Sequence, residues 1–205
     1  YRPNLVLLAV KPNQFEQLFD EKVKSFLKSA LIISIIAGKK LSLLKKITGN
    51  KLKTVRAMTN TPISVGMGIS VVFFDKRTSS SSKRKSKFFL KLVGLVNEVK
   101  KEALIDSFTA IFGSGPAYIY YFIEVITKIA KKNGHENADL MTIQLFLGSL
   151  LLMLNEKESP MSLRKKVTSK GGTTQAAIRE LEESNQFMKL MNKAISLSLI
   201  HISEP

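Results

Sequence analysis

Residues 31–37 read Leu-Ile-Ile-Ser-Ile-Ile-Ala, an apolar run that Gly38 closes. An apolar run without alternation is typical of a strand that is buried on both faces of a parallel sheet. Residues 4–10, Asn-Leu-Val-Leu-Leu-Ala-Val, have the same character and stop at Lys11-Pro12. Between the two runs, residues 14–28 carry apolar side chains at helical spacing. We therefore predict a strand, a helix and a second strand parallel to the first.

The chain after residue 38 continues the same alternation. Residues 41–47 have a short helical pattern, Gly49-Asn50 indicates a turn, and residues 52–58 have the pattern of a third strand. Strands and helices that alternate at this spacing predict right-handed crossovers and a parallel sheet. Residues 69–74 are a candidate for one more strand. The serine- and lysine-rich stretch 78–87 is either a solvated loop or the frayed start of a helix.

From residue 102 onward the apolar spacing changes to that of helices. Glycine-bearing breaks at residues 113–116 and 170–173 interrupt it. We predict helices over residues 102–112, 116–133, 138–155, 162–167, 174–183 and 187–196. The predicted fold class is therefore α/β then all-α, with an α/β domain over residues 1–97 and a helical domain over residues 98–196.

The last residues, 197–205, read Leu-Ser-Leu-Ile-His-Ile-Ser-Glu-Pro. This text resembles the translation of a transposon adapter that is used in sequencing libraries, and we predict a non-native tail. The alternative is a genuine C-terminal tail. If the tail is non-native, His201 plays no part in function.

The composition excludes several kinds of chemistry. The 205 residues include no Cys and two His, His135 and His201, which lie far apart in the sequence. The absence of Cys removes disulfides, thiolate nucleophiles and Cys-ligated zinc, and it suits a reducing compartment. Two distant histidines argue against a His-based metal site and against a Ser-His-Asp triad. The remaining possibilities are chemistry done by a cofactor, by hydroxyls and backbone amides, or no chemistry.

The net charge is +16, from 32 Lys and Arg against 16 Asp and Glu. Only six of the 32 are Arg, and the lysines are scattered except for one dense run at residues 76–87. A nucleic-acid binder more often uses arginine together with clustered aromatic side chains. We expect no nucleic-acid partner, although a basic helical protein that binds nucleic acid or an anionic surface stays open as an alternative function.

No membrane span is predicted. The longest apolar run, residues 145–154, is about half the roughly 20 residues that a spanning helix needs. We interpret this run as a buried core helix and expect no membrane partner.

The strongest local signal is residues 167–174, Val-Thr-Ser-Lys-Gly-Gly-Thr-Thr, which lead into a helix pattern. Adjacent glycines allow positive φ, so that successive N–H groups can converge on an anion, and the helix N-terminus adds positive potential. The hydroxyls of Ser169, Thr173 and Thr174 surround the same turn. A small carboxylate could bind here, and an ordinary Gly-Gly turn between helices with threonine capping fits equally well.

Small or polar residues follow three of the predicted strands, at Ala9-Val10-Lys11-Pro12, Ala37-Gly38 and Asn60-Thr61-Pro62. Ligands bind at the carboxyl ends of strands in open parallel sheets, so these three ends could form the floor of a cofactor site. Turn residues also end strands where no ligand binds. Residues 113–118, Gly-Ser-Gly-Pro-Ala-Tyr, open a helix, where they serve either close packing or a substrate site.

Five motifs follow one another along the chain: AVKP at residues 9–12, AG at 37–38, MTNTP at 58–62, GSGPAY at 113–118 and VTSKGGTT at 167–174. With these motifs the chain resembles the pyrroline-5-carboxylate reductase family over residues 4–196. The resemblance implies an incomplete Rossmann-type parallel-sheet domain and a helical domain that joins subunits into a homodimer or a higher homo-oligomer. It further implies a cytoplasmic oxidoreductase that reduces 1-pyrroline-5-carboxylate to L-proline with NADPH or NADH, the last step of proline biosynthesis.

The resemblance also assigns site residues. Thr174 would be the catalytic residue, with its hydroxyl bonded to the ring nitrogen of the substrate. The substrate-binding residues would be Ser169, Gly171, Gly172, Thr173, Thr174 and Glu102. The cofactor-binding residues would be Ala9, Val10, Lys11, Pro12, Ile35, Ile36, Ala37 and Asn60. No metal-binding residue is predicted.

The sequence departs from the family pattern in two kinds of place. Phe112 stands where the family usually has Ser, and Lys170 stands where it usually has Pro, both in the region of the site. The family also begins with a strand and a glycine-rich turn that cradles the pyrophosphate, and the first βα unit is absent from this chain. We therefore expect a fragment that alone binds dinucleotide poorly and is weakly active or inactive. A related imine or hydroxyacid reductase with the same two domains is a further alternative.

Overall fold

The computed structural model describes residues 2–49 and 53–203. They divide into two compact units, which are described separately. The first comprises Tyr1–Pro116 and Ile195–Pro205, and the second comprises Ala117–Ala194.

The first unit is built on a five-stranded sheet of order β1-β2-β3-β4-β5. Its strands are β1 (Leu5–Leu8), β2 (Leu31–Ser34), β3 (Thr54–Thr59), β4 (Gly68–Phe73) and β5 (Gly94–Val99). The pairs β1–β2, β2–β3 and β4–β5 are parallel, whereas β3 and β4 are antiparallel. The α/β class and the parallel arrangement predicted for the first three strands are confirmed, and β4, the candidate fourth strand, pairs antiparallel to β3. Residues 60–67 are too few for the crossover of about a dozen residues that a parallel pair needs.

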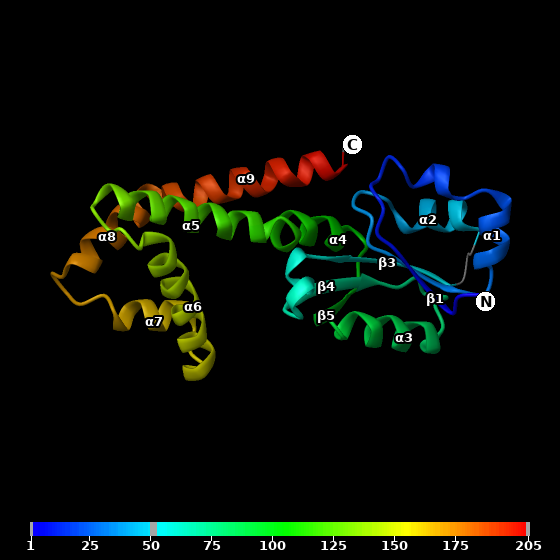
Figure 1. The fold of residues 1–205 in the computed structure, drawn as a ribbon, viewed down its shortest axis with the longest axis horizontal. Coiled ribbons are helices and arrows are strands. Elements are labelled where there is room, and N and C mark those ends of the chain that lie inside the picture. Colours follow the sequence, from blue (N-terminus) through cyan, green and yellow to red (C-terminus); the bar gives the residue numbers. More distant parts are fainter. Residues whose placement is uncertain (1, 50–52, 204–205) are drawn as a thin grey trace. The chain divides into compact units, whose positions relative to one another are not determined.

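Helices cover both faces of this sheet (Figure 1). The helical elements of the first unit are η1 (Glu16–Leu18), α1 (Glu21–Leu27), α2 (Leu41–Thr48), η2 (Thr61–Val65), α3 (Ser80–Lys91), α4 (Ala103–Phe108) and η3 (Thr109–Gly113). Neighbouring residues of β2 point to opposite faces: Ile32 packs in a core cluster with Leu44 of α2, and Ile33 packs with Leu90 of α3. Burial on both faces explains why β2 has no polar alternation.

Three local predictions have different outcomes. The helix predicted over residues 14–28 is interrupted, because the Asp20 side chain accepts the Val23 N–H at 2.7 Å and starts a new helix at Glu21. Of the two alternatives for the stretch 78–87, the start of a helix is confirmed, because most of it lies in α3, whose first turn is capped by the Ser79 hydroxyl. The predicted turn at Gly49-Asn50 and the start of the strand predicted over residues 52–58 lie partly outside the described residues.

Strand β5 was not predicted, and it crosses the proposed domain boundary at residue 97. Asn97 and Glu98 interrupt its apolar pattern, and half of its residues are exposed. Its pairing with β4 depends on Gly94, which has φ +141° and whose added Cβ would lie 2.0 Å from the Gly68 carbonyl oxygen. The boundaries at residues 97 and 196 stay predictions.

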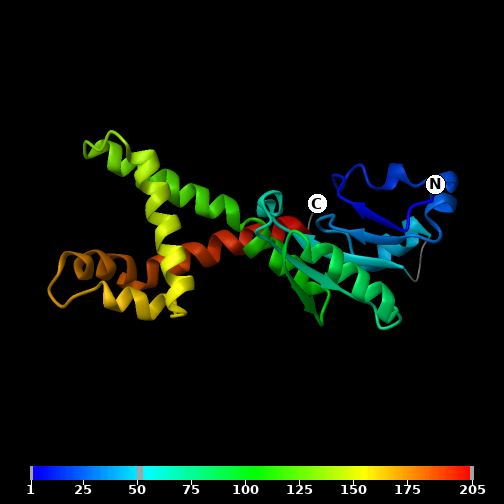
Figure 2. The same cartoon turned by 60° about the horizontal axis from the view of Figure 1, so that its bottom comes forward.

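The helices of the chain after η3 are α5 (Gly115–Lys132), α6 (Ala138–Glu156), α7 (Pro160–Lys166), α8 (Thr173–Glu182), η4 (Glu183–Asn185) and α9 (Gln186–Ser203). Each helix predicted after residue 113 has its counterpart here (Figure 2). The predicted non-native tail begins inside α9, which continues through it to Ser203. Within the first unit, Ser198 of this helix lies 3.4 Å from Ser114, hydroxyl to hydroxyl.

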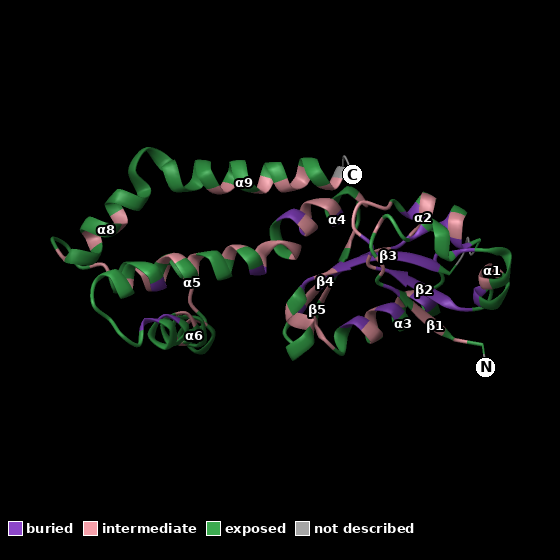
Figure 3. Cartoon of the chain, turned by 45° about the horizontal axis from the view of Figure 1, so that its top comes forward, coloured by how far each residue is buried: buried purple, intermediate pink, exposed green. Residues whose placement is uncertain are grey.

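Helix α6 is apolar around its circumference and largely exposed within the second unit (Figure 3). The expectation of a buried core helix is therefore wrong for this unit. By length and composition alone, α6 is the one helix among the described residues that could cross a membrane. Its exposed large side chains are Leu140, Met141, Ile143, Leu145, Leu147, Leu150, Leu151, Leu152 and Leu154.

Asp75 makes the stability of the first unit depend on pH. The backbone N–H of Arg77 and the Lys45 ammonium, 2.8 Å away, hold the pKa of Asp75 below its usual 3.8. A carboxyl with a lowered pKa in the folded state stabilises the fold above pH 3.8, and this contribution is lost as the pH falls through the lowered pKa. We expect Asp75→Asn to lower the melting temperature at pH 6, by an amount that shrinks in acid. A melting-temperature difference that stays constant from pH 6 into acid would contradict this.

Candidate active site

The carboxyl ends of three parallel strands meet at one edge of the sheet. Ala9 and Val10 follow β1, and Ile35 follows β2 and donates its N–H to the Leu8 carbonyl at 3.0 Å. Lys11 and Pro12 continue the first of these ends, where the Gln14 N–H bonds to the Lys11 carbonyl. Neighbouring strand ends at one edge are the place where open α/β sheets bind ligands.

The loop between β2 and α2, residues 35–40, is held at both ends. The Ile36 N–H donates to the Ser34 hydroxyl at 3.4 Å, and the Ile36 side chain is buried. Gly38 supplies a left-handed turn with φ +70°. At the far end, the Leu41 N–H, in the first turn of α2, donates to the Glu102 carboxylate at 2.6 Å. The predicted cofactor residues Ile35, Ile36 and Ala37 thus lie in a fixed loop.

Asn60, which follows β3, uses both ends of its side-chain amide within the first unit. Its Oδ1 accepts the Ile69 N–H at 2.9 Å, and its Nδ2 donates to the Phe112 carbonyl at 3.2 Å. The residue is 9% exposed. Asn60 therefore joins the end of β3 to β4 and to η3, a π-helical turn of a kind that is frequent at functional sites.

Arg56 lies in β3 and is only 1% exposed, yet it carries a full charge. Its Nη1 is 3.0 Å from the Glu102 carboxylate, and its Nη2 is 2.5 Å from the Asp106 carboxylate. Glu102 and Asp106 are four residues apart at the start of α4, so both face the strand. The resemblance assigned Glu102 to the substrate, and the structure places its carboxylate on Arg56 and on the Leu41 N–H.

The turn before α8 carries the other predicted residues. Gly171 has φ +75°, and its N–H donates to the Gln175 side chain at 2.7 Å. Gly172 is the N-cap residue of α8, and an added Cβ there would lie 2.5 Å from the Ser169 hydroxyl. The first glycine therefore permits the left-handed turn, and the second lets Ser169 approach the helix start.

The start of α8 is suited to an anion. Gly172 has no side chain to cap the helix, which leaves the first N–H groups of α8 without a side-chain cap among the described residues. Thr173 and Thr174 begin the helix and are exposed. The positive end of a ten-residue helix and the hydroxyls of Ser169, Thr173 and Thr174 therefore surround one exposed place.

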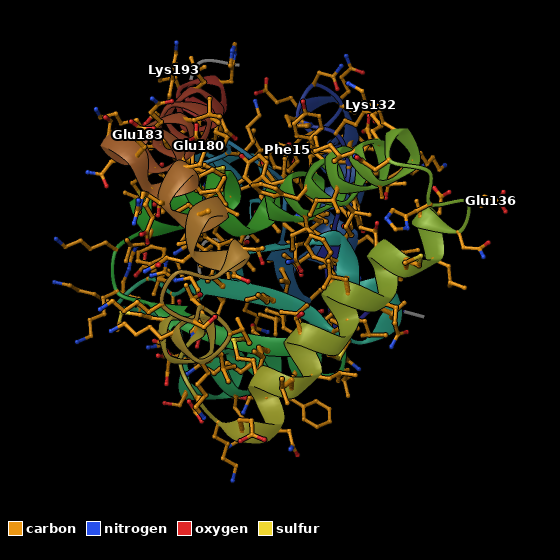
Figure 4. All side chains as sticks on the ribbon, turned by 90° about the vertical axis from the view of Figure 1, so that its left-hand side faces the viewer. Phe15, Lys132, Glu136, Glu180, Glu183 and Lys193 are labelled. Atoms are coloured by element: carbon orange, nitrogen blue, oxygen red, sulfur yellow. The ribbon has the colours of Figure 1, made fainter. Side chains whose placement is uncertain are left out.

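A cleft of about 740 Å³ lies beside this turn, between α7 and α8 of the second unit. Opposite charges line it: Arg164 and Arg179 on one hand, and Glu180 and Glu183 on the other, the last two labelled in Figure 4. The Arg164 guanidinium is bonded to Glu182, another residue of the lining. With its cations partly neutralised in this way, the cleft is less suited to a free carboxylate than the helix start is.

The structure gathers the predicted residues into two groups. The cofactor residues and Glu102 lie in the first unit, and the residues from Ser169 to Thr174 lie in the second. Arg56 and Asp106 were missed by sequence reasoning. The available signals were a lone arginine in an otherwise uncharged strand, Thr-Val-Arg-Ala-Met-Thr, and two acids four residues apart at a helix start.

An α/β sheet domain of Rossmann type followed by helices is a plan found among dinucleotide-dependent oxidoreductases. Comparison with known proteins narrows this class. Residues 102–204 match the family model described as pyrroline-5-carboxylate reductase dimerisation. Pyrroline-5-carboxylate reductase 2 of Bacillus subtilis is 33% identical over 88% of this chain, and the chain spans 65% of its length. A pyrroline-5-carboxylate reductase of Pseudomonas aeruginosa is 32% identical, covering 94% of this chain and 71% of that protein.

Solved structures agree with these relatives. A pyrroline-5-carboxylate reductase from Coxiella burnetii has a TM-score of 0.87 and 36% identity, covering 98% of this chain and 75% of the solved one. The Plasmodium falciparum enzyme, solved with NADP bound, has a TM-score of 0.83 and 30% identity, covering 96% and 79%. The chain belongs to the pyrroline-5-carboxylate reductase family. This membership confirms the resemblance that the five motifs carry.

Proposed function

We propose that this protein reduces 1-pyrroline-5-carboxylate to L-proline with NADPH or NADH. The names of its relatives give them as pyrroline-5-carboxylate reductases, and the solved Plasmodium falciparum relative holds NADP. The observation that carries the proposal is the Gly171-Gly172-Thr173-Thr174 turn, which is surrounded by hydroxyls and forms a helix start without a side-chain cap in the part of the chain that the structure describes. This arrangement suits a small anionic ring compound because it offers N–H donors to a carboxylate and hydroxyls to a ring nitrogen.

The nicotinamide end of the cofactor would lie on the strand-end edge of the first unit. Ala9, Val10, Lys11 and Pro12 would border it on one side, and Ile35, Ile36 and Ala37 on the other. The fit rests on the fixed backbone there: the loop after β2 is hydrogen-bonded to Leu8, Ser34 and Glu102. Asn60 would contribute by fixing the backbone at the end of β3, because both polar atoms of its side chain are already bonded within the first unit.

When bound, the cofactor supplies a hydride from C4 of its nicotinamide. The protein has to hold the substrate in line and to favour protonation at the ring nitrogen. Ser169 and Thr173 would hold the carboxylate. The backbone of Gly171 and Gly172, which the resemblance also assigns to the substrate, would contribute its N–H groups once they leave the Gln175 side chain and the Ser169 carbonyl, to which they donate in this structure. The Thr174 hydroxyl would donate to the ring nitrogen and would orient the substrate or relay a proton from water, because its pKa is far too high for it to ionise as a free acid.

The second unit supports a homodimer. Residues 102–204 match a dimerisation model, and α6 presents the exposed apolar side chains that an interface between two copies would bury. We therefore assign the uncovered face of α6 to a second copy of the chain. A cytoplasmic location accords with the absence of cysteine.

Purified protein of the full length that its gene encodes tests the proposed function. We expect oxidation of NADPH or NADH that depends on 1-pyrroline-5-carboxylate and yields proline in equal amount. 1-Pyrroline-2-carboxylate, which carries the imine at the other ring carbon, serves as the matched control substrate and should react far more slowly. No proline from the first substrate, or equal rates with both, would refute the proposed substrate.

A further inference from the structure

We infer that Arg56 is a positioning residue for the nicotinamide cofactor, acting through Glu102 on the loop 35–40; this inference rests on the proposed function. Arg56 bonds to Glu102 at 3.0 Å, and the same carboxylate oxygen accepts the Leu41 N–H at 2.6 Å. The guanidinium is thereby connected, through one oxygen atom, to the first turn of α2.

The loop joins β2 to α2 and contains the proposed cofactor residues Ile35, Ile36 and Ala37. Its first residues are fixed by Leu8 and Ser34. At its other end the Lys40 carbonyl accepts the Leu44 N–H of α2, and the next residue, Leu41, donates its N–H to Glu102. Glu102 lies at the start of another element, α4. Arg56, in the interior of the sheet, donates to the Glu102 carboxylate and thereby fixes its position.

The free-energy cost of burying the Arg56 guanidinium favours a role for this residue beyond stabilising the fold. A guanidinium that is 1% exposed is costly to bury, and Nε of Arg56 finds no hydrogen-bond partner within the described residues. Buried ion pairs often stabilise a fold no better than apolar residues of similar volume would. Arginine nevertheless has one property that apolar residues lack, since its planar fork bonds two carboxylates at a fixed angle. Asp106 at 2.5 Å completes the fork and sets the direction of the bond to Glu102.

The test is Arg56→Lys in the full-length protein. Lysine keeps the charge and a single bond, but it lacks the fork. We expect the KM for NADPH to rise about tenfold, with kcat and the KM for 1-pyrroline-5-carboxylate changed by less than about threefold. Amide hydrogen exchange at Leu41 should become faster, because its bond to Glu102 is loosened.

Lys45→Met is the matched control. Lys45 lies on α2, as Leu41 does, and its replacement removes the 2.8 Å ion pair between Lys45 and Asp75. The contact between Glu102 and Leu41 stays in place. We expect it to lower the melting temperature without changing the KM for NADPH or the exchange at Leu41.

The possible results separate the two claims. An active wild type whose NADPH KM and Leu41 exchange are unchanged by Arg56→Lys overturns the inference and leaves the proposed function intact. A rise in KM that Lys45→Met reproduces also overturns it, because general destabilisation would then suffice. A wild type that forms no proline overturns the proposed function, and with it this role for Arg56.

Discussion

Thr174→Ala is expected to lower kcat/KM for 1-pyrroline-5-carboxylate by a factor on the order of 10–10³ while the protein stays folded. The hydroxyl is proposed to bond to the ring nitrogen, whose charge changes when the neighbouring carbon accepts the hydride. Loss of the hydroxyl should therefore slow the chemical step. Thr174 is exposed at the start of α8, and its removal therefore leaves no cavity in a core. Steady-state kinetics and a thermal melt of the same preparation measure the two effects.

Two further variants control this result. Thr174→Ser keeps the hydroxyl and should recover most of the activity. Thr168→Ala removes a hydroxyl from the same region, but that hydroxyl already donates to the Arg164 carbonyl at 2.6 Å, so its loss should cost much less. Kinetics of Thr174→Ala equal to wild type would refute the proposed role of Thr174.

The largest loss of stability is expected from Arg56→Ala, at about 3–5 kcal/mol of unfolding free energy for the first unit. Removal of the guanidinium leaves Glu102 and Asp106, side chains that are 27% and 23% exposed, without their shared cation. It also leaves a hole in one of the largest fully buried side-chain sites of the chain. Urea unfolding followed by circular dichroism measures the difference.

Arg77→Ala is the control for charge alone. The Arg77 side chain is 73% exposed and lies 3.8 Å from Asp75. An exposed pair of this kind contributes about 0–1 kcal/mol. If Arg56→Ala were no more destabilising than Arg77→Ala, the buried cluster would have no structural importance.

Much of the fold could be predicted because its signals are local. The runs at residues 4–10 and 31–37 are apolar on both faces, and the structure places β1 and β2 within them, each shorter than its run. The helices after residue 113 follow from long stretches with helical spacing and from glycine-bearing breaks. The turn at residues 167–174 could be recognised as a candidate anion site because paired glycines, hydroxyls and a helix start occur together.

The features that escaped prediction depend on partners that are distant in the sequence. Strand β5 is stabilised by β4, not by its own mixed pattern, and Gly94 lies opposite Gly68 at a place where a Cβ would not fit. Glu102 and Arg56 are 46 residues apart, so their bond cannot be seen in either motif. The exposure of α6 was missed because an apolar helix has the same pattern whether its own unit or another copy covers it.

The most direct test of the central claim follows the hydride itself. Full-length protein would be given NADPH that carries deuterium at the reactive C4 position, together with unlabelled 1-pyrroline-5-carboxylate, and the proline formed would be examined by NMR. Reduction of the imine carbon predicts one deuterium at C5 of proline and none at the α-carbon. Deuterium at the α-carbon, or proline without deuterium, would contradict the assignment of this chain as the reductase of that imine.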